Sequence, residues 1–164
     1  MSLRRFAAVF RLDLAQYARR VSLWVLVLLL AFTAFGLSTG EMKIQSGDTA
    51  VGGAKAWITS QFSNAFMLSL VIFLFYSFFV TISAGLSVVR DEETKTGELL
   101  HSTPLTSGEY IWGKFSAVVC AFLGVMALHL FMTAFCNHLL PNDRAAEIRG
   151  PFLLGNYLVP FVVF

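Results

Sequence analysis

Long runs of apolar residues constrain this chain more than any other feature of its sequence. The first extends from Val21 to Leu37 ("VSLWVLVLLLAFTAFGL") without an ionisable side chain, and about 17 such residues are the minimum for a helix that crosses a bilayer. Longer runs extend from Phe66 to Val89 and from Phe115 to Leu140. Hydrophobic residues make up 57% of the chain and charged residues only 13%, which is typical of a membrane protein. The sequence therefore predicts an all-α, polytopic transmembrane protein.

A fourth apolar run, from Pro151 to Phe164, is shorter than the others. At about 14 residues it cannot cross roughly 30 Å of hydrocarbon. We therefore interpret residues 1–164 as a single transmembrane domain that is an N-terminal fragment, with 151–164 as the start of a fourth span.

Residues 1–20, which precede the first span, have the pattern of an amphipathic helix. On a helical wheel one arc carries Leu3, Phe6, Ala7, Phe10, Leu14 and Tyr17, and the opposite side carries Arg4, Arg11, Gln16 and Arg19. Such a helix is expected to lie at the membrane interface. A plain helical lead-in that ends in stop-transfer arginines is the alternative.

Lysine and arginine residues are unevenly distributed between the loops. Eight of the twelve precede the first span or lie between the second and third, and the other four lie in the remaining loops. Because basic residues favour the cytoplasmic side, the N-terminus and residues 90–114 are predicted to be cytoplasmic in a multi-pass inner (plasma) membrane protein. The loop from Ser38 to Ala65 is predicted to be a solvated connection on the other side.

The segment "RDEETKTGELLHSTPLTSGEYIWGKF", which begins at Arg90, is the polar exception between two apolar runs. Its acidic beginning favours a helix, and Pro104 is expected to end that helix because it disfavours the helical state of Thr103. Thr106 and Glu109 have the spacing of a capping box, which predicts the start of the next helix. Charged loops are commonly just solvated, so this pattern alone leaves a docking role and a plain loop equally open.

The same segment resembles the permeases of type-two ATP-binding-cassette exporters. The matching residues are Glu92, Glu93, Gly97, Leu99, Leu100, Thr103, Pro104, Tyr110, Gly113 and Lys114. In that family an amphipathic helix leads into the first span, and the loop between the second and third spans is a coupling region that contacts the ATPase subunit. The chain departs from the family in having Gly97 and Glu98 where many relatives have Gly-Thr, and three spans with a stub where the family has about six.

The resemblance implies a permease that moves an unidentified substrate, driven by ATP hydrolysis in a nucleotide-binding partner subunit. It implies a permease dimer in the lipid bilayer, no catalytic site, cofactor or metal of the chain's own, and no nucleic-acid partner. A phosphate-binding "GxxxxGK[ST]" motif is absent from the 164 residues, so ATP would be bound by the partner. The residues expected to contact the ATPase are Asp91, Glu92, Glu93, Gly97, Glu98, Leu99, Leu100 and Pro104.

Two further interpretations stay open at this stage. The stretch "ELLHSTP" also resembles a subgroup whose permease is fused to a zinc aminopeptidase, although no "HExxH" occurs in these 164 residues. The alternative function is a membrane anchor or assembly protein whose cytoplasmic loop binds a soluble partner. His129 and His138 are expected to point about 180° apart on one helix and to share no metal.

Overall fold

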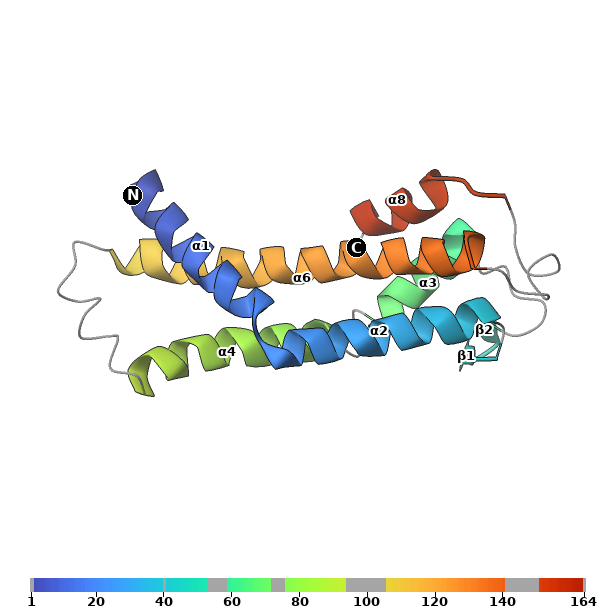
Figure 1. Cartoon of the computed structure of the whole chain (residues 1–164), viewed down its shortest axis with the longest axis horizontal. Coiled ribbons are helices and arrows are strands. Elements are labelled where there is room, and N and C mark those ends of the chain that lie inside the picture. The colour runs from blue at the N-terminus through green and yellow to red at the C-terminus, as the bar shows by residue number, and fades with distance from the viewer. Residues whose placement is uncertain are drawn as a thin grey trace. The chain divides into compact units, whose positions relative to one another are not determined.

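The computed structural model describes residues 2–39, 41–52, 59–71, 76–93, 106–140 and 151–163. Apart from one short hairpin, the elements are helices, as the sequence predicts (Figure 1). In chain order they are α1 (Leu3–Ala18), α2 (Val21–Thr39), β1 (Lys43–Ser46), β2 (Thr49–Gly52), α3 (Gln61–Val71), α4 (Ser77–Glu93), α6 (Ser107–His138) and α8 (Gly155–Val163).

Two of the described helices, α2 and α6, are long and apolar enough to cross a membrane. Helix α2 contains the whole first predicted span. Helix α6 contains nearly all of the third, but it begins at Ser107, well before the predicted boundary at Phe115. Its 32 residues extend over about 48 Å, whereas the hydrocarbon layer is roughly 30 Å thick. The first turns of α6 therefore lie outside the membrane-spanning part.

The second predicted span, from Phe66 to Val89, lies in α3 and α4. These helices are described on either side of residues 72–75, so the continuity of that span lies outside the described residues and stays a prediction.

A β-hairpin occupies part of the loop that was predicted to be a solvated connection. Strands β1 and β2 pair antiparallel, with Ser46 opposite Thr49. The two-residue turn between them begins at Gly47, whose φ is 58°. Two-residue hairpin turns require positive φ, which glycine adopts without a steric cost. A Gly-Asp pair between short polar strands is a recognised hairpin signal, and the sequence interpretation overlooked it.

The described chain divides into two compact units. The first comprises Met1–Leu23 and Leu74–Gly124, and so contains α1, α4 and the first part of α6. Its buried apolar side chains include Tyr17, Tyr76 and Phe122. The rings of Tyr76 and Phe122 meet edge to face, with their centroids 5.9 Å apart. This unit contains the start of α6, where the coupling segment returns to the helix.

The second unit comprises Trp24–Phe73 and Val125–Phe164. One stripe of α2, formed by Leu26, Leu30, Ala34 and Leu37, is buried, as the 3.6-residue helical period allows. Helix α3 packs against α8. The side chain of Asn156, in α8, donates a hydrogen bond to the carbonyl of Thr59 over 2.7 Å.

Within this second unit, α2 and the second part of α6 run in the same direction. The His129 ring donates a hydrogen bond to the backbone carbonyl of Leu30, and the Ser38 hydroxyl donates to the carbonyl of Cys136 over 2.7 Å. The residue numbers therefore increase in the same direction along the two helices. The spans that begin at Val21 and Phe115 therefore enter from the same side, as the predicted topology requires.

Candidate functional site: the contact of α1 with the start of α6

The residues predicted to contact an ATPase lie at and beyond the end of α4. Asp91, Glu92 and Glu93 form its last described residues, and Glu93 is exposed. The remaining predicted contacts, Gly97, Glu98, Leu99, Leu100 and Pro104, lie outside the described residues. The helix stop predicted at Pro104 lies there too and stays a prediction.

The predicted capping box at the start of α6 is confirmed. The backbone N–H of Glu109 donates to the Thr106 hydroxyl over 3.3 Å, and the backbone N–H of Thr106 donates to Glu109 Oε2 over 3.1 Å. The two side chains thus satisfy donors that a helix start otherwise leaves unpaired. The coupling segment therefore re-enters the helical structure at a position fixed by its own sequence.

Glu109 also connects this helix start to α1. Its Oε1 accepts a hydrogen bond from the backbone N–H of Ser2, and the side chain is buried. The bond from Ser2, followed by those from Thr106, lowers the pKa of the Glu109 carboxyl, because hydrogen bonds to a carboxylate favour its charged form. The Glu109 carboxylate precedes the apolar run that begins at Phe115, and it carries a negative charge at neutral pH.

One turn further along α6, Gly113 allows α1 to approach closely. A Cβ at this position would lie 2.8 Å from Val9 Cγ1 and 3.0 Å from Val9 Cβ. Real side chains do not reach such distances, and the β-branched valine is stiff. The glycine of the "GK" pair is therefore required by helix packing in this structure.

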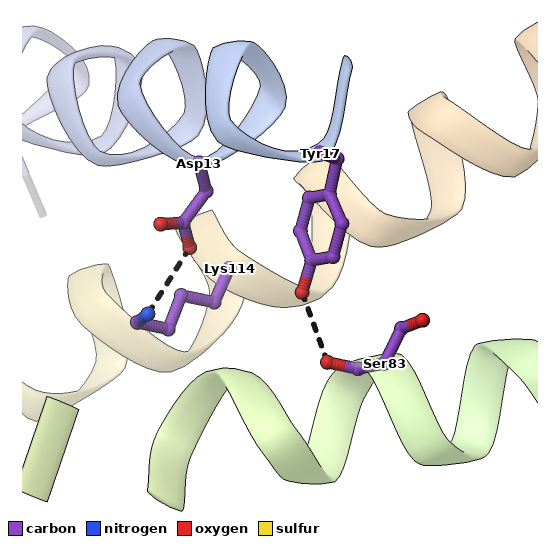
Figure 2. Close-up of polar contacts among 4 residues, drawn as sticks. All are labelled: Asp13, Tyr17, Ser83 and Lys114. Carbon is purple, nitrogen blue, oxygen red and sulfur yellow. Dashed lines mark hydrogen bonds and ion pairs between the residues drawn. The ribbon is translucent and has the colours of Figure 1, made fainter. Parts of the chain in front are cut away.

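The lysine of the same pair forms a buried ion pair with α1 (Figure 2). Lys114 Nζ lies 3.3 Å from Asp13 Oδ2, and the two side chains are only 8% and 6% exposed. The ammonium group also lies 5.1 Å from the centroid of the Tyr110 ring. Charges removed from water to this extent need a partner, and removing either partner leaves the other uncompensated.

Tyr17, one turn after Asp13, connects α1 to α4. Its hydroxyl donates to the carbonyl of Ser83 over 3.1 Å, and its ring is buried (Figure 2). The Arg20 guanidinium lies 4.3 Å from the centroid of the same ring. Helix α1 is thus held to both helices that flank the coupling segment.

The contacts also give the direction of α1. Between Ser2 and Asp13 it advances about 16 Å, while the matching contacts on α6, Glu109 and Lys114, are only about 7 Å apart along that helix. The two helices therefore cross obliquely (Figure 1).

The residues of the predicted apolar face of α1 differ in their burial. Phe6, Phe10 and Leu14 are half-buried, but Leu3 and Ala7 are exposed. Asp13, which the wheel interpretation left out, is buried instead. Asp13 lies three residues after Phe10 and therefore falls on the apolar side of the helix. A single carboxylate on that side indicates that a basic residue pairs with it in the fold.

The two histidines of α6 contact different neighbours. His129 faces α2, whereas His138 Nε2 lies 2.9 Å from the Tyr157 hydroxyl of α8. An apolar pocket of about 590 Å³ lies beside this second pair, between α6 and α8. Among the residues that the structure describes, no group of three or more His, Cys, Asp and Glu side chains could hold a metal ion.

Comparison with known proteins agrees with this arrangement. The model of the ABC-2 family transporter protein matches residues 7–143, a range that includes α1 from Ala7 onward, α2, the capped start of α6 and the segment before it. No curated protein and no solved structure matches the chain. Because the family model covers most of the 164 residues, the chain belongs to the ABC-2 family of transporter proteins and is a membrane permease component of an ABC transporter.

Proposed function

We propose that this permease moves its substrate by receiving force from a separate ATPase subunit through residues 90–114, and that α1 and the start of α6 are the first parts displaced. One observation carries the proposal. The coupling segment ends at the capped start of α6, where Asp13 and Lys114 form a buried ion pair between α6 and α1. A force that reaches the start of α6 would therefore be passed to α1 through the cap and this ion pair.

The chemistry of the segment supports a protein partner of opposite charge. Asp91, Glu92, Glu93 and Glu98 form an acidic cluster in the sequence, and Leu99 and Leu100 follow directly. The carboxylates would pair with basic residues of the ATPase, and the leucines would fill an apolar groove in it. ATP would be bound by that subunit alone.

The orientation proposed is a cytoplasmic N-terminus in the inner membrane. The parallel course of α2 and the second part of α6 supports a common side for the residues before each span, and the segments proposed for that side carry eight of the twelve basic residues. An ATPase needs cytoplasmic ATP, so the proposed dock and the proposed topology agree. A dimer of permeases would supply the second half of the transport path.

Co-purification of the full-length protein from native membranes tests the proposal. We expect a nucleotide-binding subunit to be recovered with it, and to be lost in the double variant E92K/E93K. The matched control is E41K/D48K, which makes the same change of charge at two exposed residues beside the hairpin. Retention of the ATPase by E92K/E93K would contradict the dock, and an intact preparation without any ATPase would favour the membrane anchor.

The same preparation tests the fused zinc aminopeptidase that "ELLHSTP" suggests. The intact mass of the purified chain, together with its zinc content, would reveal a peptidase domain. A product without zinc and of permease size would contradict membership of that subgroup, with no consequence for the transport proposal.

A further inference from the structure

The arginines of and after α1 fall into two groups with different surroundings. Arg5 lies close enough to Glu109 to contribute to lowering the pKa of that carboxyl, and Arg20 lies over the Tyr17 ring. In contrast, Arg4, Arg11 and Arg19 are exposed, and their side chains have no hydrogen bond or ion pair within the described part of the chain.

These three arginines share one face of the helix. At 100° per residue they fall within an arc of about 80°, opposite the side that carries Asp13 and Tyr17. Ala8 and Ala15 lie between them, and Leu12 lies just beside the arc. Asp13, the one acidic residue of α1, is turned inward to Lys114. The outward face therefore carries positive charge with no acidic residue to balance it.

Both ends of α1 place this face at the level of the membrane surface. Only Arg19 and Arg20 separate α1 from the span that begins at Val21. Its contacts on α6 lie between Glu109 and Lys114, directly before the apolar run. Trp112, in the same turns of α6, is exposed, and Trp24 follows Arg20 by four residues in the sequence. Tryptophan is enriched where a protein meets lipid headgroups.

We propose that Arg4, Arg11 and Arg19 bind the phosphate groups of anionic phospholipids. Neighbouring arginines in the set are about 10 to 12 Å apart along the helix, so each takes a separate headgroup. A guanidinium group binds phosphate through paired hydrogen bonds, and Leu12 and the alanines between them contact the boundary of the acyl chains. The inference concerns the lipid surface and does not depend on the ATPase partner.

Tryptophan quenching by brominated lipids tests this in the full-length protein. Replacing every other tryptophan of the protein by Phe, Trp57 among them, leaves Trp24 and Trp112 as reporters. The probes are brominated phosphatidylglycerol and brominated phosphatidylcholine in detergent micelles, where membrane orientation does not affect the result. We expect a preference for phosphatidylglycerol that weakens as salt is raised.

The decisive variant is R4Q/R11Q/R19Q. We expect the preference for phosphatidylglycerol over phosphatidylcholine to fall about fivefold for each arginine replaced. The control K43Q/R144Q/R149Q makes the same change of charge elsewhere and should keep the preference. The variant R4K/R11K/R19K should keep most of the preference, because the attraction is mainly electrostatic. A thermal transition unchanged in all three variants shows that α1 stays docked.

Three results would overturn the proposal. Equal quenching by both lipids in the protein with its natural arginines would show that the face does not select anionic headgroups. Full preference in the glutamine variant would place the selectivity elsewhere. An unchanged lipid preference together with loss of a co-purifying soluble protein would show that the face binds a protein instead.

Discussion

Helix α6 makes two contacts of different chemistry along its length. Near its start it meets α1 through a buried ion pair and a carboxylate, Asp13 with Lys114 and Glu109 with Ser2. In its second half it meets α2 through apolar side chains and neutral hydrogen bonds such as that of Ser38. Each contact is described within its own unit.

The difference follows from the surroundings. Charges in the hydrocarbon layer are costly even when paired, so the α2 contact uses hydroxyl and backbone groups. Before the apolar run, an ion pair that opens can regain water. The α1 contact is therefore the one that could open and close during transport, and the α2 contact is the one expected to persist.

Breaking the ion pair should have the largest effect. Asp13→Ala leaves Lys114 buried without its partner, and such losses cost about 3–5 kcal/mol of stability. The double variant D13L/K114M removes both charges and should recover most of that loss. Thermal unfolding in one detergent, arranged as a double-mutant cycle, measures the coupling.

Asp48→Ala is the control for this variant, because Asp48 is an exposed acidic residue in the hairpin turn. We expect it to change stability little. If Asp13→Ala lowered the stability as little as Asp48→Ala, the ion pair would not make the α1 contact of α6 different from its α2 contact.

Crowding the same contact should have the next largest effect. Gly113→Ala places a Cβ 2.8 Å from Val9 Cγ1, and overpacking of this kind costs about 1–3 kcal/mol. Gly124→Ala, in the same helix, meets nothing within 4 Å and should gain up to about 1 kcal/mol from helix propensity. The difference in unfolding temperature between the two variants measures the crowding.

Val9→Ala is expected to rescue Gly113→Ala, because it removes the methyl groups that the new Cβ would meet. Rescue would show that the close approach of α1 matters, whereas equal stability of Gly113→Ala and Gly124→Ala would contradict it.

Local signals in the sequence were sufficient to predict α2 and the start of α6. The apolar run at Val21 predicts α2, and the spacing of Thr106 and Glu109 predicts the cap of α6, because each depends only on neighbours in the chain. The ion pair depends on Lys114, far from Asp13 in sequence. A single sequence shows that a carboxylate on an apolar face needs a partner, but it does not name that partner.

The face of α1 shows a second limit. Leu3 and Ala7 lie on the predicted apolar arc and are exposed, while Asp13 is buried. An apolar residue suits both a protein contact and a lipid contact, so hydrophobicity does not separate the two. The docking residues from Asp91 to Pro104 stay a prediction from family resemblance.

The neutral contact should show a smaller effect than the charged one. Ser38→Ala removes the hydrogen bond to the Cys136 carbonyl, and such interhelical bonds in membranes contribute about 0.6 kcal/mol on average. The control is Thr33→Ala, whose hydroxyl donates to the Leu30 carbonyl within the same helix. A loss for Ser38→Ala as large as that for Asp13→Ala would remove the distinction between the two contacts.

The smallest expected effect is the pH dependence of the Glu109 contact. The hydrogen bonds from Ser2 and Thr106 lower the pKa of this carboxyl in the folded protein below its ordinary value of 4.5. The folded state therefore holds its proton less tightly than the unfolded state, so the contribution is fully present above pH 4.5 and is lost as the pH falls through the lowered value. Unfolding temperatures of the natural protein and of Glu109→Gln should differ by a constant amount at neutral pH and converge in acid. Gly124→Ala, whose new Cβ meets nothing within 4 Å, should keep its difference from the natural protein across the same range, and convergence of that variant as well would show that acid weakens the whole helix packing rather than the α1 contact.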